Sequence, residues 1–289
     1  MKATTPVSTA DGSPTLYSET YCEHYHSLSG AYEESLHKFV YPSNVLEKSR
    51  SQSVKVLDIC FGLGYNSLST LEHGCNGYPI NITAIEKDEN VIERASNLSY
   101  PFKAWTHLMK SLGKDQEVDY KNGNIQLVVA DARHCLEGIH EEYDVIYLDP
   151  FSTLKNPELW TYHFFKELKD RLKSDGCIVT YSSALPVQRG FMKCGLNVYR
   201  TQAVGRRRGG TIASLSKRKD LEVLSPKEQF LLEHSDGSIP YRDPKLQSSP
   251  EEILIKRKKL IKYLLKKKKI YKVKHCYKAQ MWEKRPIDK

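Results

Sequence analysis

The sequence contains no long apolar stretch. No run approaches the roughly 18 consecutive apolar residues of a membrane-spanning helix, so a membrane protein is not expected. Residues 1–14 are polar and lack the apolar core of a secretory signal, which predicts a cytoplasmic protein. Seven cysteines are present, yet none forms a C-x-x-C pair or has a histidine at zinc-site spacing. We therefore expect reduced thiols and no metal site.

Charge is distributed unevenly along the chain. The formal net charge is +9 over 289 residues. Residues 251–289 contain 15 Lys or Arg and 4 Asp or Glu, a local balance of +11. The other 250 residues hold 29 basic and 31 acidic residues, a balance of −2. The sequence thus predicts a near-neutral body with a basic tail, which suits a solvated face, a membrane surface or a phosphate-rich partner.

Short β-branched runs alternate with longer amphipathic segments between residues 54 and 181. This alternation predicts right-handed βαβ units and a parallel sheet with both faces covered. Two β-rich segments within 196–215 predict an antiparallel hairpin that ends the sheet. The five apolar runs are 54–59, 80–85, 125–130, 143–148 and 177–181. This doubly wound α/β arrangement resembles the class I methyltransferases, which have a Rossmann-like, mostly parallel, seven-stranded sheet with a terminal antiparallel hairpin.

Composition divides the chain into three parts. Residues 1–50 form an N-terminal extension expected to contribute to the active site, 51–216 form the α/β domain, and 217–289 form a connection and a basic C-terminal helix. Residues 157–172 have a helical pattern. Ser249-Pro250-Glu251-Glu252 supplies an N-cap, a proline at the first helical position and a capping-box glutamate, so a helix should begin there and continue to Lys269.

A glycine loop follows the first predicted strand, in Asp58-Ile59-Cys60-Phe61-Gly62-Leu63-Gly64-Tyr65-Asn66. The third glycine of a G-x-G-x-x-G dinucleotide motif is absent. Asp58 places a carboxylate before the loop, where it suits a cationic amino acid group better than a phosphate. Gly62 and Gly64 let a ligand approach the backbone at the start of a helix.

Two further acids end the second and third predicted strands. Glu86 can accept hydrogen bonds from both hydroxyls of a ribose. Asp131, which Ala132 follows, can accept one from an adenine amino group. Because parallel strands bring their carboxyl ends to one edge, these acids and the loop predict a pocket for S-adenosyl-L-methionine, with Asp58 and Asn66 near its methionine end. NAD remains an alternative, since Glu86 would serve it equally.

The fourth predicted strand ends in Leu148-Asp149-Pro150-Phe151-Ser152, where the methyl group of the cofactor should project. A nitrogen nucleophile gains positive charge as it takes a methyl group. A carboxylate can orient its N–H and stabilise that charge, so Asp149 is the candidate catalytic residue and also borders the cofactor. Pro150 and Phe151 would offer a flat apolar surface to a base.

The segment from Tyr147 to Trp160, with its Lys155-Asn156-Pro157-Glu158 block, resembles the signature of the MnmC-like tRNA methyltransferases. The resemblance extends over about residues 15–244. Thr153-Leu154 and Gln188 depart from the family pattern, the latter standing where the first of two arginines is usual. Four further blocks are similar: Gly62–Asn66, Thr180–Ala184 with Gln188–Gly190, Gly205–Arg208, and Tyr25–Ser27 with Glu33–Ser35.

The resemblance implies an enzyme that methylates the 5-aminomethyl group of the wobble uridine in tRNA, giving 5-methylaminomethyl-(2-thio)uridine. Bifunctional members carry a second, flavin-dependent domain, for which this chain has neither room nor motif, so we expect a stand-alone and preferably monomeric methyltransferase. Tyr25 would assist Asp149 at the amine, and Trp160 is either a stacking or a core residue. The residues expected to bind the RNA are Phe151, Lys155, Asn156, Arg189, Arg206, Arg207 and Arg208.

Two other functions stay open at this point. An aminopropyltransferase of the spermidine synthase type shares the fold and an acid-rich amine pocket, but it would have no use for the +11 tail. A non-catalytic RNA-binding methyltransferase fold is the other alternative, and the set of acids at the strand ends argues against it. For the leading hypothesis, the tail would hold the anticodon arm, because each lysine that meets a phosphate releases a counterion.

Overall fold

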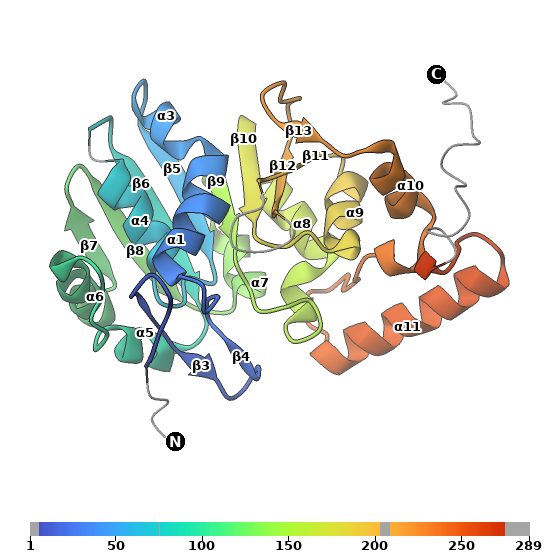
Figure 1. The fold of residues 1–289 in the computed structure, drawn as a ribbon, viewed down its shortest axis with the longest axis horizontal. Helices are drawn as coiled ribbons and strands as arrows, with labels where there is room; N and C mark the ends of the chain where they lie inside the picture. Colours follow the sequence, from blue (N-terminus) through green and yellow to red (C-terminus); the bar gives the residue numbers. More distant parts are fainter. Residues whose placement is uncertain (1–5, 75, 203–208, 275–289) are drawn as a thin grey trace.

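The structure, a computed structural model, describes residues 6–74, 76–202 and 209–274. Its centre is a nine-stranded sheet with the order β13-β11-β12-β10-β9-β5-β6-β8-β7 (Figure 1). In chain order the strands are β5 (Val54–Ile59), β6 (Ile80–Glu86), β7 (Glu117–Tyr120), β8 (Gly123–Val129), β9 (Tyr143–Leu148), β10 (Leu172–Thr180), β11 (Asn197–Arg200), β12 (Thr211–Ser214) and β13 (Glu222–Val223).

The five predicted parallel strands are confirmed as β5, β6, β8, β9 and β10, which pair in parallel. The predicted hairpin is confirmed as well, since β12 pairs antiparallel with β10 and β11 pairs antiparallel with β12. The chain runs from β5 outward through β6 to β8, and then from β9 outward on the other side. The direction therefore reverses between β5 and β9, and ligands of doubly wound sheets bind at the carboxyl edge of such a point.

Two edge strands were not predicted. β7 pairs antiparallel with β8 across a turn at Lys121 and Asn122. The dipeptide Asn122-Gly123 is an ordinary hairpin signal, so this strand could have been found from the sequence. β13 adds two residues beside β11 at the opposite edge and has no comparable signal.

Both faces of the sheet are covered, as the alternation along β5 illustrates. Val54 and Val56 join one hydrophobic core, whereas Leu57 and Ile59 join the other. The first face is covered by α1 (Ala31–Ser35), the π-helical η1 (Leu36–Val40), α3 (Val45–Ser49), α4 (Tyr65–His73), α5 (Glu89–Ala95) and α6 (Lys103–Asp115). The second is covered by α7 (Ala132–Cys135), η2 (Leu136–Gly138), η3 (Pro157–Trp160), α8 (Tyr162–Lys169) and α9 (Leu185–Lys193).

The continuous helix predicted over 157–172 is wrong. The chain forms the 3-10 turn η3 and then α8, with Thr161 between them in an extended conformation. The Thr161 hydroxyl accepts a hydrogen bond from the Phe164 N–H at 3.2 Å and so caps α8. Leu172 already belongs to β10.

Trp160 is a core residue and not a stacking surface. Its side chain is fully buried, and its Nε1 donates to the carbonyl oxygen of Phe151 at 2.8 Å. The core interpretation of Trp160 is therefore confirmed, and the stacking interpretation is wrong.

The N-terminal extension forms two small hairpins before α1. They are β1 (Val7–Ser8) with β2 (Pro14–Thr15), and β3 (Tyr17–Ser18) with β4 (Glu23–His24). The Tyr65 hydroxyl, at the start of α4, donates to the Pro14 carbonyl at 2.7 Å and ties this segment to the α/β domain. α2 (Tyr41–Ser43) follows η1 and leads toward α3.

The C-terminal part begins with α10 (Pro226–His234) and η4 (Asp236–Ser238) and ends in α11 (Pro250–Lys266), which lies at one end of the molecule (Figure 1). Ser249 and Glu252 form the predicted capping box. Ile253 is the one buried residue of α11, so most of the helix is solvated. α11 ends at Lys266 and is slightly shorter than predicted. No helix of the described residues has the length and apolar character needed to cross a membrane.

Candidate active site

A cavity of about 690 Å³ lies at the carboxyl ends of the central strands. Residues 18–28 of the N-terminal extension form one wall, and the ends of β5, β6, β8 and β9 form the other. Of the predicted site residues, the lining includes Tyr25, Gly62, Glu86, Asp131, Ala132, Asp149, Phe151 and Asn156. The fold thus brings residues from five separate segments to one place.

The glycine loop has the backbone conformation that its sequence predicts. Gly62 and Gly64 have φ values of 56° and 80°, in the left-handed region that favours glycine. A Cβ on Gly64 would lie 2.8 Å from the Phe61 ring, and one on Gly62 would lie 3.3 Å from the Tyr25 ring. Gly62 therefore makes room for the N-terminal wall of the cavity, and Gly64 makes room for the core beneath the loop.

Asp58 and Asn66 lie behind the loop and do not line the cavity. Asp58 is fully buried, and its Oδ2 accepts a hydrogen bond from the Ser67 hydroxyl at 2.6 Å. Burial raises the pKa of Asp58 to about 7, although the Ser67 hydrogen bond opposes this shift. Among the described residues, Oδ1 of Asp58 and Oδ1 of Asn66 have no hydrogen-bond partner.

Glu86 is held by backbone N–H groups at the end of β6. Its Oε2 accepts from Gly62 at 2.9 Å, and its Oε1 accepts from Lys87 and Asp88 at 2.8 and 2.9 Å. Burial nevertheless raises the pKa of Glu86, because the loss of hydration outweighs these hydrogen bonds. The carboxylate is thus fixed in orientation beside the glycine loop.

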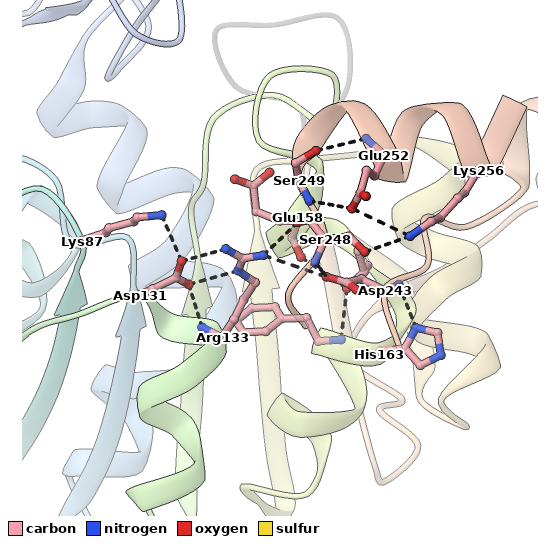
Figure 2. Close-up of polar contacts among 12 residues, drawn as sticks. Lys87, Asp131, Arg133, Glu158, His163, Asp243, Ser248, Ser249, Glu252 and Lys256 are labelled. Atoms are coloured by element: carbon pink, nitrogen blue, oxygen red, sulfur yellow. Dashed lines mark hydrogen bonds and ion pairs between the residues drawn. The ribbon is translucent and has the colours of Figure 1, made fainter. Parts of the chain in front are cut away.

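Asp131 ends the next strand and is held by cations (Figure 2). Its Oδ1 accepts from the Arg133 N–H and Nε, both at 3.1 Å, and its Oδ2 accepts from Arg133 Nη2 at 2.8 Å and Lys87 Nζ at 3.0 Å. Although burial opposes the effect, these donors hold the pKa of Asp131 well below its usual range. Asp131 is therefore ionised at neutral pH.

Asp149 follows β9 directly and faces the cavity. Its backbone N–H donates to the Ile59 carbonyl at 3.1 Å, which joins it to the end of β5. Its Oδ2 accepts a hydrogen bond from Nδ2 of Asn66 at 2.9 Å. The position of the carboxylate is thus set by the end of β5 and by the first turn of α4.

Three aromatic rings border the cavity beside Asp149. Tyr21 stacks on Phe151 with ring centroids 4.3 Å apart, and Tyr25 meets Phe151 edge-on at 5.0 Å. Burial raises the pKa of both tyrosines, so each phenol keeps its proton at physiological pH. The rings present apolar surface and a polar hydroxyl, which suits a nucleobase with an amino substituent.

The wall formed by the N-terminal extension is joined to the loop after β9, residues 149–152, by one carboxylate. Glu23 Oε2 accepts from the Ser152 N–H at 3.0 Å, and its Oε1 accepts from the Ser152 hydroxyl at 2.5 Å. His26 on the same segment also lines the cavity, and burial lowers its pKa to about 4, so its imidazole is neutral at pH 7.

Several predicted RNA contacts lie elsewhere. Lys155 is exposed outside the cavity, and Arg189 donates to the Ser238 hydroxyl at 2.7 Å. Gln188, at the position of a usual arginine, is buried and donates to Thr211 at 3.2 Å, so a phosphate contact there is excluded. Arg206, Arg207 and Arg208 lie outside the described residues.

Other cavity residues were not predicted, among them Tyr21, His24, His26, Glu158 and Tyr181. Three of these stand within the family blocks of the sequence, namely His26 in Tyr25–Ser27, Glu158 after Lys155-Asn156-Pro157 and Tyr181 after Thr180. Their place within these blocks could have identified them as site residues from the sequence. Tyr21 and His24 lie in a segment of weak periodicity, and only the fold brings them to the strand ends.

Comparison with known proteins supports the chemistry expected of this cavity. A family model described as an S-adenosyl-L-methionine-dependent methyltransferase matches residues 97–216. An uncharacterized protein of Methanocaldococcus jannaschii is 31% identical, over 96% of this chain and 79% of that protein. The crystal structure of MNMC2 from Aquifex aeolicus superposes with a TM-score of 0.79 and 33% identity, covering 91% of this chain and 86% of that one. The chain belongs to the MnmC-like methyltransferase family. Its cofactor is S-adenosylmethionine, and its fold is that of the class I methyltransferases.

Curated relatives of this MnmC-like protein include longer enzymes. The tRNA 5-methylaminomethyl-2-thiouridine biosynthesis bifunctional protein MnmC of Paraburkholderia xenovorans is 26% identical over 72% of this chain. This chain spans 34% of that protein's length. The shared part therefore covers a methyltransferase, while the activity of the whole bifunctional protein is a separate question.

The residues of the MnmC-like protein fit its cofactor. The cavity edge combines a glycine loop at a helix start with the Glu86 carboxylate, and behind the loop Oδ1 of Asp58 and Oδ1 of Asn66 lack partners among the described residues. A sulfonium cofactor with an ammonium group and two ribose hydroxyls offers the cation and the donors that such carboxylates bind.

Proposed function

We propose that this protein methylates the amine of 5-aminomethyl-(2-thio)uridine at the wobble position of tRNA, giving 5-methylaminomethyl-(2-thio)uridine. The observation that carries the proposal is the position of Asp149, a carboxylate on the cavity wall that is oriented by Asn66 and bordered by aromatic rings. The relatives named as tRNA 5-methylaminomethyl-2-thiouridine biosynthesis proteins support the same substrate.

In this proposal the cofactor occupies the edge formed by β5, β6 and β8. Gly62 and Gly64 shape the loop around it, and Glu86 accepts hydrogen bonds from the hydroxyls of its ribose. Asp58 and Asn66 stand toward its methionine end, and Asp131 and Ala132 stand toward its adenine. S-adenosylmethionine supplies an electrophilic methyl group on a sulfonium sulfur.

Asp149 orients the amine that receives the methyl group. An alkyl amine is mostly protonated at neutral pH and must lose a proton to solvent water before its nitrogen has a free lone pair. Asp149 accepts a hydrogen bond from the amine and aims the lone pair, and its charge stabilises the positive charge that develops on nitrogen. Tyr25 keeps its proton and assists as a neutral hydrogen-bonding group. Phe151 and Asn156 contact the base, and Lys155, Arg189 and the arginines at 206–208 contact the RNA backbone.

The test uses tRNA from cells that lack the final methylation. The protein is incubated with methyl-labelled S-adenosylmethionine and this tRNA, and the product is digested to nucleosides. We expect the label in 5-methylaminomethyl-(2-thio)uridine. Asp149→Ala should lower the turnover number by about 10²-fold or more, because the group that orients and stabilises the amine is lost. Binding of S-adenosylhomocysteine should remain within a few fold.

The control is Asp170→Ala, since Asp170 is exposed at the end of α8 and lies outside the cavity. This variant should keep the wild-type turnover number. Label found in a different nucleoside would overturn the substrate, and full activity of Asp149→Ala would overturn the catalytic role. Incubation with decarboxylated S-adenosylmethionine and polyamines tests aminopropyl transfer, and we expect no product.

A further inference from the structure

The Asp131 carboxylate has no acceptor position left for a ligand. A carboxylate offers about four lone-pair directions on its two oxygens. Here four donors use them, namely the Arg133 N–H, Nε and Nη2 and the Lys87 ammonium, at 2.8 to 3.1 Å. An adenine amino group could bind Asp131 only by displacing one of these cationic or backbone donors.

Arg133 is itself held in place, so this arrangement is rigid (Figure 2). Its Nη1 donates to the Ser248 carbonyl at 3.2 Å and lies 3.9 Å from Oδ2 of the buried Asp243. Its side chain is 10% exposed. Because the connection before α11 fixes the guanidinium from the far side, Arg133 cannot swing away from Asp131 without breaking these interactions.

A second carboxylate lines the same cavity and is differently placed. Glu158 is 8% exposed, and among the described residues its Oε2 has no hydrogen-bond partner. Figure 2 shows Glu158 and Asp131 both beside the Arg133 guanidinium. Arg133 interacts electrostatically with both carboxylates, which compensates their charges without filling the free oxygen of Glu158.

A buried carboxylate oxygen without a donor is costly, so a donor from a ligand is expected there. The apolar residues that follow each acid, Ala132 and Leu159, also line the cavity and offer surface to a flat ring. The only neutral N–H donor on the aromatic base of S-adenosylmethionine is its 6-amino group. A free acceptor beside apolar surface matches that group.

We propose that Glu158, and not Asp131, accepts the hydrogen bond from the 6-amino group of the cofactor's adenine. In this arrangement Asp131 is a positioning residue, which holds Lys87 and Arg133 around the base. The assignment rests on S-adenosylmethionine as the cofactor and holds whichever amine receives the methyl group.

The test compares two ligands by isothermal titration calorimetry in the absence of tRNA. S-adenosylhomocysteine carries the 6-amino group, whereas its 6-deamino purine analogue carries only hydrogen at that position and has no N–H donor on the base. We expect the wild-type protein to bind the adenosine compound about tenfold tighter or more, because the analogue leaves the buried carboxylate without a donor. Glu158→Gln should reduce this ratio about tenfold, since a neutral amide loses less than a carboxylate when the 6-amino donor is absent.

Asp131→Asn is the matched comparison and should keep the wild-type ratio, even if it weakens both ligands together. Glu158→Leu should lose most of the ratio, and thermal unfolding checks that each variant is folded. The proposal is overturned if Glu158→Gln keeps the wild-type ratio, if it weakens both ligands equally, or if Asp131→Asn abolishes the ratio. Failure of the tRNA assay with these ratios intact would contradict the proposed substrate alone.

Discussion

At the scale of single residues, four acids end neighbouring strands and have four different environments. Asp131 is saturated by cations, Glu86 is held by backbone N–H groups, Asp149 accepts from Asn66, and Asp58 is enclosed by protein. The four carboxyl groups therefore differ in charge and in available lone pairs, because both depend on burial and on the neighbouring hydrogen-bond donors.

Asp58 gives a prediction on pH. Its pKa is raised to about 7 in the folded protein, above the usual value of the unfolded chain. Between about pH 4 and pH 7 the folded state therefore binds more protons, so Asp58 favours folding at the acidic end and this contribution is lost as the pH rises. Without cofactor, the free energy of unfolding of the wild type should fall relative to Asp58→Asn over this range, by up to a few kcal/mol at about 1.4 kcal/mol per pKa unit.

Urea unfolding of both proteins at several pH values measures this difference. Asp170→Asn, an exposed acid, should follow the wild type throughout. A constant difference between Asp58→Asn and the wild type from about pH 4 to pH 7 would contradict the raised pKa.

At the scale of elements, the β3–β4 hairpin forms part of the cavity although it is remote in sequence from the strand ends. Glu23 joins it to Ser152 through two hydrogen bonds, and Tyr21 stacks on Phe151. The hairpin has only two residues in each strand, so its own ladder is too short to hold it. Its contacts with the loop after β9 therefore help to hold it over the cavity.

Glu23→Ala should accordingly loosen this wall. We expect S-adenosylhomocysteine to dissociate several-fold faster from the variant, because two hydrogen bonds to a charged acceptor are removed and the hairpin opens more often. Stopped-flow fluorescence measures the rate. Glu19→Ala removes an exposed acid from the same hairpin and should leave the rate unchanged. Equal dissociation from wild type and Glu23→Ala would show that the hairpin is held by other contacts.

At the scale of the whole molecule, α11 begins beside the wall of the cavity and carries its exposed lysines away from it. The Ser248 carbonyl, just before α11, accepts from Arg133, and α11 packs on η3. From there the helix runs to one end of the molecule (Figure 1). Not every basic residue of α11 is available to a partner. Arg257 donates to the carbonyls of Ile239 and Gly237 and lies 4.7 Å from the Tyr241 ring, so it anchors the helix.

The exposed lysines give a prediction on tRNA affinity. Replacing Lys258, Lys259 and Lys262 by Gln should weaken tRNA binding and reduce the slope of log K against log salt by about 0.7 to 0.9 for each phosphate that is no longer neutralised. Binding of S-adenosylhomocysteine should be unchanged. Filter binding over a range of salt concentrations measures the tRNA affinity and its salt slope, and calorimetry measures the binding of S-adenosylhomocysteine.

Lys110 and Lys114 provide the control, since they are exposed on α6 at the opposite end of the molecule. Their replacement by Gln should leave the salt slope as in the wild type. An unchanged slope in the α11 variant, with its helix content intact by circular dichroism, would exclude a role for α11 in binding tRNA.

Local patterns were sufficient for much of the fold. The apolar runs located the five parallel strands, and Ser249 with Glu252 located the start of α11, because strand periodicity and capping are properties of neighbouring residues. Thr161 was missed as a helix break, since its capping hydrogen bond competes with a strong helical pattern on both sides. How much of α11 is exposed to solvent also could not be predicted, because it depends on which other segments pack against the helix.

The sequence by itself determined the five parallel strands, the glycine loop and the acids at the strand ends, because each is encoded within a few residues. Only the tertiary structure decided which lone pairs those acids keep. Arg133 and Lys87 occupy the acceptor positions of the Asp131 carboxylate. Glu158, 27 residues after Asp131, retains a buried oxygen without a partner among the described residues. Availability of an acceptor depends on every donor within about 3 Å, and the fold draws those donors from distant segments.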